Sequence, residues 1–275
     1  MHEFFRIVGL LIAGAASGLI GSLLGLGGGI FLIPALVLIF KVPMHSAVAA
    51  GLVAVIATSS AGGSRNAQKG LANVRLGMTL EVATVLGALA GGLLAPSLPA
   101  RLLGLLFSTL LLVVSVVLWL RRRSRDAGEY SARGGLLDGR YYEPAARREV
   151  RYSIKRLPAA LAASMAAGML SALLGVGGGI VKVPVLHLFC GVPMRAATAT
   201  SNLMIGVTAA ASAMLYLTGG FVPALVCATV SLGVLAGSRA GLWLARRLSE
   251  GMIRRIFSAV TLIIAVLILR RFLAG

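Results

Sequence analysis

The sequence predicts an all-α integral membrane protein, built from two repeats that cross the membrane in opposite orientations. Apolar residues make up 58% of the 275-residue chain and charged residues 12%, whereas about a quarter of the residues in a soluble domain are charged. Uncharged stretches longer than the roughly 18 residues that a spanning helix needs recur along the whole chain. A glycine-rich motif also occurs twice. Together these observations predict a multi-pass membrane protein.

The glycine-rich motif belongs to a repeat at an offset of 150 residues. GLIGSLLGLGGGIFLIPAL at residues 18–36 reappears as GMLSALLGVGGGIVKVPVL at residues 168–186. The same offset pairs Pro43 with Pro193 and continues without a gap, which indicates two structural repeats joined by a linker. We therefore expect a first transmembrane repeat at residues 1–120, a basic cytoplasmic linker at residues 121–156 and a second transmembrane repeat at residues 157–275.

Each repeat is predicted to hold five helical elements, the second of which is too short to cross a bilayer. These short elements, residues 29–40 and 179–190, would each span only about 18 Å at 1.5 Å per residue. We interpret them as half-helices that follow the glycine-rich breaks. About eight long transmembrane helices complete the prediction, at residues 7–24, 44–64, 77–96, 102–120, 157–174, 196–216, 222–244 and 255–271.

The distribution of basic residues predicts the orientation of each repeat. The linker holds eleven Lys and Arg residues against five Asp and Glu residues, and basic loops tend to stay on the cytoplasmic side. Counting crossings from the linker places the basic loops at residues 65–75 and 246–255 in the cytoplasm, whereas the uncharged loop at residues 217–221 faces outward. Equivalent loops thus face opposite sides, which predicts inverted-topology repeats, a signature of secondary transporters.

The two matched glycine runs are the strongest indication of a binding site in the sequence. Irregular backbone at membrane depth is tolerated only where it is buried in protein or lines a watery cavity. Each run also precedes a half-helix, whose free N–H groups and positive dipole end suit an anion. We therefore predict that an anion is contacted by the amides of residues 27–29 and 177–179. The alternative is that the glycines only permit close helix packing.

Polar side chains of the second repeat add to this predicted site. Lys182 lies one turn into the second half-helix, where a cation is either a functional residue or one that extends to the interface. Thr200, Ser201 and Asn202 could bind an oxyanion, and Thr58 and Ser59 of the first repeat could contribute, although Ser and Thr in membrane helices often bond their own backbone. The predicted substrate-binding residues are Gly27, Gly28, Gly29, Gly177, Gly178, Gly179, Lys182, Thr200, Ser201 and Asn202.

Other polar residues indicate no metal or cofactor site. His45, His187, Cys190 and Cys227 lack metal-ligand spacing, so we expect neither a metal ion nor a cofactor. For Glu81, in an apolar segment, an ion pair, a position near the interface and a proton relay all stay open. The net charge of +18 comes from basic clusters with few interleaved aromatic residues, which argues against nucleic acid. The expected partners are a small anionic substrate, the lipid bilayer and a coupling ion such as a proton.

The doubled GxGGGxxxxP motif resembles the TauE/SafE family of membrane proteins, the sulfite and organosulfonate exporters. The resemblance covers nearly the whole chain and rests on GLGGGIFLIPAL with Pro43, GVGGGIVKVPVL with Pro193, and ATATSN at residues 197–202. It implies a permease of about eight helices in a bacterial or archaeal inner membrane, which moves small sulfur-containing or carboxylated anions. In the first repeat, AAGL at residues 49–52 replaces the family's usual Thr-Ser element, so the two halves of the site are expected to differ.

The sequence therefore favours a secondary transporter that exports small anions by alternating access, and not an enzyme. A passive anion channel remains an alternative. An intramembrane serine protease could use Ser17, but a catalytic serine needs a positioned base, and the repeat mate of Ser17 is Ala167. The ATP-binding motif GxxxxGK[ST] does not occur. These patterns leave open which anion is carried, in which direction it moves, which ion is coupled and how many subunits assemble.

Overall fold

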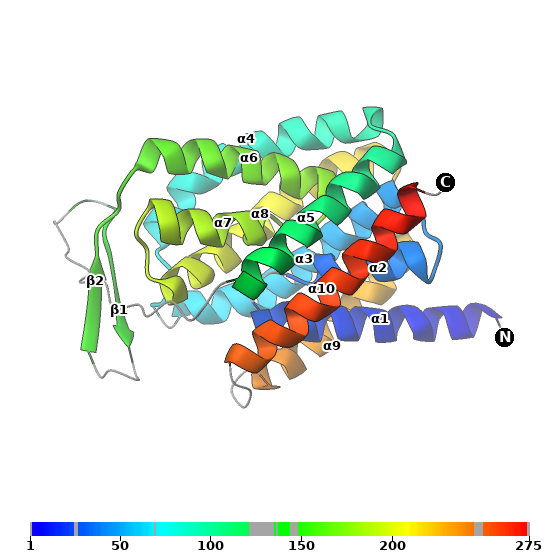
Figure 1. The fold of residues 1–275 in the computed structure, drawn as a ribbon, viewed down its shortest axis with the longest axis horizontal. Coiled ribbons are helices and arrows are strands. Elements are labelled where there is room, and N and C mark those ends of the chain that lie inside the picture. Colours follow the sequence, from blue (N-terminus) through cyan, green and yellow to red (C-terminus); the bar gives the residue numbers. More distant parts are fainter. Residues whose placement is uncertain are drawn as a thin grey trace.

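The computed structural model is mostly helical, and it describes residues 2–24, 27–68, 70–120, 135, 137–143, 148–244 and 250–273 (Figure 1). The helices follow the predicted order, and two short strands, a 3₁₀ turn and a π-helical turn are present in addition. The elements are α1 His2–Leu24, α2 Gly29–Leu38, α3 Met44–Gln68, α4 Val74–Leu94, η1 Ala95–Ser97, α5 Ala100–Leu120, β1 Gly139–Glu143, β2 Arg148–Tyr152, α6 Leu157–Leu174, α7 Gly179–Pro184, η2 Val185–Phe189, α8 Met194–Thr218, α9 Ala224–Leu244 and α10 Glu250–Leu273.

Local sequence signals fix several helix ends. The Asn73 side chain caps α4 by accepting a hydrogen bond from the backbone N–H of Leu76 at 3.1 Å, as a short polar side chain does at a helix start. Gly175 ends α6 with a φ of 69°, a left-handed conformation that glycine adopts at little cost. Pro193 precedes α8, where its fixed φ suits the start of a helix.

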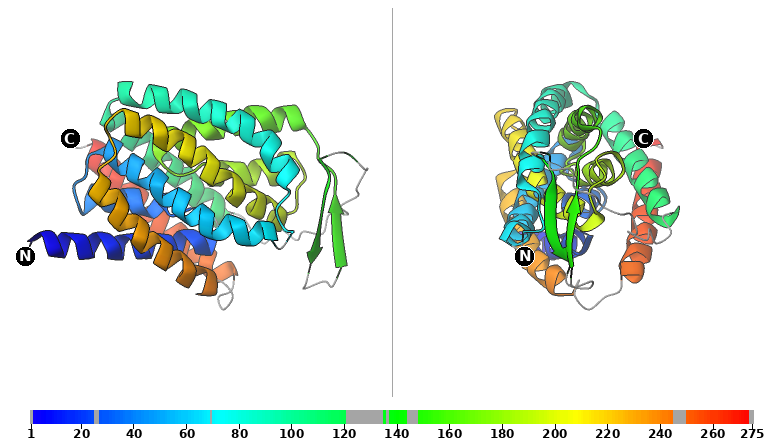
Figure 2. Two further views of the ribbon diagram at one scale, coloured as in Figure 1. Left: turned by 180° about the vertical axis from the view of Figure 1, so that it is seen from behind. Right: turned by 90° about the vertical axis from the view of Figure 1, so that its left-hand side faces the viewer.

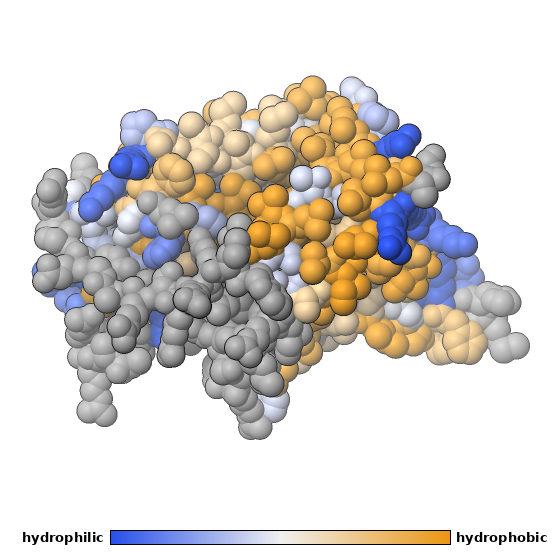
Figure 3. Space-filling view, in the orientation of Figure 1, coloured by the Kyte–Doolittle hydropathy of each residue, from blue (hydrophilic) through white to orange (hydrophobic). Residues whose placement is uncertain are grey.

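The long helices and their surface are those of a multi-pass membrane protein. Six described helices are long and apolar enough to cross a membrane: α1, α3, α4, α6, α8 and α9. The crossings predicted in α5 and α10 stay predictions. Large apolar side chains such as Met78, Leu93 and Leu232 are exposed, and Figure 3 shows apolar residues covering much of one face, with hydrophilic residues gathered toward its ends. Such a surface suits a hydrocarbon environment.

The element bounds and the helix packing both follow the repeat. Helices α3 and α8, like α4 and α9, begin and end 150 residues apart. Helix α1 packs against α9 and its repeat mate α6 packs against α4, while α3 packs on α8 and α5 on α10. The fourth helix of each repeat thus packs against the first helix of the other repeat, α4 against α6 and α9 against α1. We call α1, α2, α3 and α9 the first bundle, and α4, α6, α7 and α8 the second bundle.

Repeat mates run in opposite directions through the molecule. In Figure 1, α1 leads from the labelled N-terminus toward the strands, whereas α6 begins beside β2 and runs the other way. The strands form an antiparallel hairpin that pairs Gly139 with Tyr152, and it projects beyond one end of the helices (Figure 2). This hairpin lies in the segment that the sequence predicted only as an exposed basic linker, and its Tyr141 and Tyr152 are buried. Residues 121–134, 136 and 144–147 of that linker lie outside the described residues.

Small residues bring the paired helices into backbone contact. A Cβ added to Gly237 of α9 would overlap the carbonyl oxygen of Ala15 in α1, and one added to Gly87 of α4 would overlap that of Met165 in α6. These contacts are equivalent under the repeat. Close backbone approach of this kind is how helices associate in lipid, where no hydrophobic driving force acts between them.

We expect Gly87→Ala and Gly237→Ala each to lower stability by roughly 1–3 kcal/mol, because the added methyl group forces the paired helices apart. Thermal unfolding of the detergent-solubilised protein measures this. Gly62→Ala is the matched control, since a Cβ at Gly62 of α3 meets no atom within 4 Å. Equal unfolding temperatures for all three variants would contradict the packing role of Gly87 and Gly237.

Candidate functional site

Glycine residues in the left-handed conformation interrupt the helical structure at both predicted places. The φ angles are 82° at Gly27, 74° at Gly177 and 72° at Gly178, values that residues with a Cβ rarely adopt. Gly28 differs from its repeat mate Gly178, because its φ is −74°. The first break therefore needs glycine for its conformation at Gly27 and not at Gly28.

The two breaks lie against each other in the middle of the molecule. A Cβ on Gly29 would overlap the carbonyl oxygen of Gly175. Val55 of α3 and its repeat mate Ile205 of α8 contact both breaks, since each lies near the Cβ positions of Gly27 and Gly177. The irregular backbone is thus buried in protein, as membrane depth requires.

The half-helices that follow the breaks differ in form. Helix α2 runs for 10 residues, whereas α7 runs for only 6 and then continues as the π-helical turn η2. Pro184 lies at this transition, where proline removes a backbone donor. The short elements predicted at residues 29–40 and 179–190 therefore exist, with the second one distorted. Short π-helical turns occur often at functional sites.

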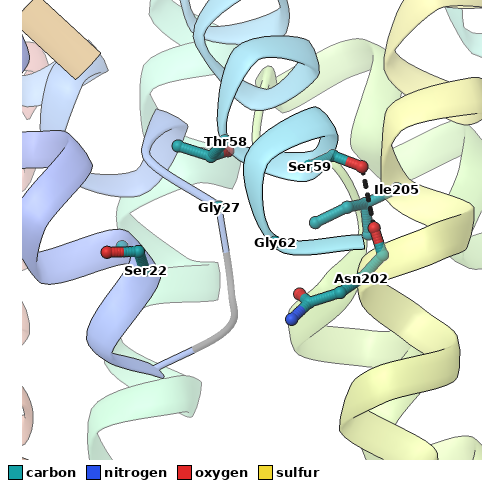
Figure 4. Close-up of a pocket in the computed structure, with 8 residues that line it drawn as sticks. Ser22, Gly27, Thr58, Ser59, Gly62, Asn202 and Ile205 are labelled. Carbon is teal, nitrogen blue, oxygen red and sulfur yellow. Dashed lines mark hydrogen bonds between the residues drawn. The ribbon is translucent and has the colours of Figure 1, made fainter. Parts of the chain in front are cut away.

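A small pocket, with a cavity volume of about 20 Å³, lies beside the first break, between the two bundles (Figure 4). Helix α1 and α3 of the first bundle form one wall and α8 of the second bundle the other. Asn202 extends from α8 into this space, and Ser59 of α3 donates a hydrogen bond to the Asn202 carbonyl oxygen at 2.7 Å. The lining residues are Gly21, Ser22, Gly27, Thr58, Ser59, Gly62, Asn202 and Ile205.

Two predicted site residues, Gly27 and Asn202, line this pocket, and the other eight do not. The hydroxyl groups of the pocket come from Ser22, which the prediction did not include, and from Thr58 and Ser59, which it named only as contributors outside the main set. Their signal in the sequence is weak, because isolated Ser and Thr are common in membrane helices. Thr58 and Ser59 do lie in the same helix as Gly62, so that small and polar residues share one stretch of α3.

Thr200 and Ser201 occupy other surroundings. The Thr200 hydroxyl accepts a hydrogen bond from the backbone N–H of Asn73 at 2.9 Å, and so joins α8 to the start of α4. Ser201 is fully buried, and its hydroxyl has no hydrogen-bond partner among the described residues. A buried hydroxyl without a partner is uncommon in proteins.

Lys182 belongs to a buried cluster with Glu81 of α4 and Thr208 of α8. Its Nζ lies 3.2 Å from Glu81 Oε2 and donates to Thr208 Oγ1 at 2.7 Å. Thr208 Oγ1 in turn lies 2.6 Å from Glu81 Oε1 and 3.2 Å from the Met204 carbonyl oxygen; its single proton favours the shorter, charged acceptor. The exposed fractions of the Lys182 and Glu81 side chains are 1% and 7%. Both side chains are therefore enclosed by protein.

Comparison with known proteins identifies relatives along nearly the whole chain. The family model described as "Sulfite exporter TauE/SafE" matches residues 10–268. The "Probable membrane transporter protein YunE" of Bacillus subtilis is 23% identical over 93% of this chain and 94% of its own, and the "Probable membrane transporter protein YdhB" of the same species is 24% identical over 82% and 84%. A "Probable membrane transporter protein" of Methanocaldococcus jannaschii is 25% identical over 94% of each chain. No solved structure matches the chain.

We expect Gly177→Ala to lower stability by about 1–3 kcal/mol and Gly28→Ala to change it by less than about 0.5 kcal/mol. Alanine at residue 177 would be strained at positive φ, and its Cβ would lie 2.5 Å from Val55 Cγ1. At residue 28 the backbone is right-handed and the nearest atom lies at 3.4 Å. Chemical or thermal unfolding in detergent compares the two. A larger loss in the Gly28 variant would overturn this description of the breaks.

A double-mutant cycle on the buried pair should show strong coupling. Lys182→Met or Glu81→Gln alone leaves one buried charge without its partner, so we expect each to cost about 3–5 kcal/mol. The double variant removes both charges and should lie within about 2 kcal/mol of the wild type. Unfolding free energies of the four proteins measure the coupling. Additive losses would show that the two side chains do not interact.

Proposed function

We propose, since this chain belongs to the sulfite exporter TauE/SafE family, that it is a secondary transporter that exports small anions by alternating access. The expected substrates are sulfite, organosulfonates or related sulfur-containing or carboxylate anions, and the expected location is the inner, or plasma, membrane of the cell. The family and the relatives carry the names of transporters and not of enzymes.

One observation carries this proposal: the pocket lies between two helix bundles, directly beside a glycine break that abuts its counterpart. A site at the interface of two repeat-related bundles is where rocking of one bundle against the other changes access from side to side. The Val55 and Ile205 side chains lie at the meeting point of the breaks, so they are the candidate barrier between the two sides.

The chemistry of the pocket suits an anion that is bound by neutral groups. Asn202 offers two amide N–H donors, and the hydroxyl groups of Ser22, Thr58 and Ser59, which here donate to backbone carbonyl oxygens, can turn to an anion that enters. Hydrogen bonds to a charged group are stronger than neutral ones, at about 1.5–3 kcal/mol each. In this conformation Lys182 is paired with Glu81, so the predicted positive potential of Lys182 is balanced.

We infer further that the repeats are inverted with respect to the membrane. The opposite directions of α1 and α6 support this orientation (Figure 1), as does the difference in charge between the equivalent loops at residues 65–75 and 217–221. The pocket then lies in the cytoplasmic half of the protein, because Thr58, Ser59 and Gly62 belong to the half of α3 that ends at Gln68, beside the basic loop. The structure would thus represent a state that receives substrate from the cytoplasm.

Flux measurements in proteoliposomes with sulfite, alkanesulfonates and small carboxylates test the function. We expect saturable transport and counterflow for at least one of these anions. Asn202→Ala should lower that flux by about tenfold or more, since tenfold corresponds to about 1.4 kcal/mol of lost hydrogen bonding to a charged group. Thr109→Ala is the control, because the exposed Thr109 hydroxyl donates to the Leu105 carbonyl oxygen of its own helix and lies outside the pocket. Unitary currents without counterflow would indicate a channel, and no flux of any tested anion would refute the function.

A further inference from the structure

The pocket beside the first break corresponds, under the repeat, to a set of positions in the second bundle, and those positions are buried. The repeat offset carries Gly21, Gly27, Thr58 and Gly62 of the pocket onto a second set of positions. All four of these are buried, and the Ser171 hydroxyl among them has no hydrogen-bond partner in the described part of the chain. We call Ser171, Gly177, Thr208 and Ser212 the closed chamber.

The buried charge cluster borders this closed chamber. Thr208 belongs to both, because it lines the chamber and exchanges hydrogen bonds with Lys182 and Glu81. In the first bundle the equivalent threonine, Thr58, lines the open pocket and donates to the carbonyl oxygen of Val55 in its own helix. If the residues of the closed chamber moved apart to form a pocket like the one in the first bundle, the charge cluster would lie at the edge of that pocket.

Only one of the two equivalent places carries charge. The repeat mates of Lys182 and Glu81 are Leu32 and Ser231, so the ion pair is not required by the fold that the two bundles share. A buried ion pair is also a poor source of stability, because desolvation offsets most of its attraction. Intramembrane charges that are retained despite this cost commonly mark substrate or proton pathways.

One N–H donor of Lys182 has no partner among the described residues. Two of the three N–H donors of Lys182 are used, one by Glu81 and one by Thr208. The Glu81 carboxylate is therefore an anion that belongs to the protein and that already occupies the lysine. A transported anion can replace the Glu81 carboxylate beside Lys182 only if Glu81 becomes neutral at the same time, because two buried negative charges would otherwise share one lysine.

We propose that Glu81 is a proton-dependent competitor of the transported anion for Lys182, so that one proton is carried with each monovalent anion. When the closed chamber opens, a proton binds the Glu81 carboxylate, its contact with Lys182 weakens, and the anion binds Lys182 and Thr208. The cluster has zero net charge before and after this exchange, since one proton and one negative charge enter together. This inference rests on the proposed transport function and names the coupling ion.

Other titratable groups on the neighbouring elements are directed elsewhere. Helix α6 contains none. The His187 ring bonds the carbonyl oxygen of Val192 at 2.9 Å, and the Tyr216 hydroxyl donates to that of Ala172 at 3.0 Å. The His45 ring of α3 bonds the carbonyl oxygen of Ala95, and Asp138 accepts a hydrogen bond from the backbone N–H of Ile154. Further groups on these elements are the buried thiol of Cys190, the buried Tyr141 and Tyr152, and the exposed Arg75, Arg140, Tyr142, Glu149, Arg151, Lys155, Arg156 and Arg195.

The test is the pH dependence of transport in proteoliposomes, with 2-hydroxyethanesulfonate as the probe because its charge does not change between about pH 5 and 8. For the wild type we expect the KM to rise with pH, by up to about tenfold per unit, because proton and anion binding are linked. A pH-sensitive dye in the lumen should report acidification during uptake. In Glu81→Gln the KM should become independent of pH and the dye signal should disappear.

Two further variants separate coupling from a loss of structure. Glu149→Gln removes an exposed carboxylate on β2 and should behave as the wild type. The neutral double variant, Glu81→Gln with Lys182→Met, should insert normally, lose the pH dependence and bind the probe at least tenfold more weakly. If Glu81→Gln alone fails to insert, the comparison of the pH dependence of KM between the wild type and the double variant tests the coupling.

The outcomes distinguish this inference from the transport function. Saturable wild-type flux with a KM that does not change with pH, or with no dye signal, overturns the coupling and leaves the transport function standing. A pH dependence that persists in Glu81→Gln or in the double variant also overturns it. Absence of flux for every anion tested, in protein that is shown to be folded, refutes the transport function and this inference with it.

Discussion

The structure depends on one constraint: backbone polar groups at membrane depth must be satisfied inside the protein, because lipid offers no partners. Both halves of the chain interrupt a helix at this depth, at Gly27 and Gly177. The two interruptions are buried against each other, with Gly29 on the carbonyl oxygen of Gly175 and with Val55 and Ile205 over both. The exchange of the fourth helix between the repeats surrounds this junction with packed helices. A cavity can then form beside the junction without exposing irregular backbone to lipid.

The two bundles share a backbone plan but differ in the polar groups beside the breaks. The first bundle has neutral hydroxyl groups around an open pocket, whereas the second has Lys182, Glu81 and Thr208 beside buried positions. In the transport cycle proposed above, the two sides would therefore present different chemistry to the substrate. In the first half-helix the position equivalent to Lys182 holds Leu32, which is fully buried.

Several site residues were predictable and others were not, for a physical reason. The glycine breaks are visible in the sequence because a conformation with positive φ demands a particular residue. Asn202 is visible because an amide in an apolar helix is costly unless it has a role. Ser22 and Thr58 look like any small polar residues of a membrane helix, and only their position around a cavity distinguishes them. Thr200, predicted as a ligand, instead accepts a hydrogen bond from the backbone of Asn73, a partner that no local pattern indicates.

The sequence by itself determined the helical elements and the repeat offset, because each helix satisfies its backbone hydrogen bonds within its own segment. It also determined the two breaks, because their backbone conformation requires glycine. The family followed from the same motifs, and it is confirmed by the match over residues 10–268. Only the tertiary structure decided that α1 packs on α9 and α4 on α6, that Glu81 reaches Lys182, 101 residues away, and that the pocket opens beside the first break. These choices depend on side-chain shape and charge between distant segments, which periodicity and spacing along one chain do not encode.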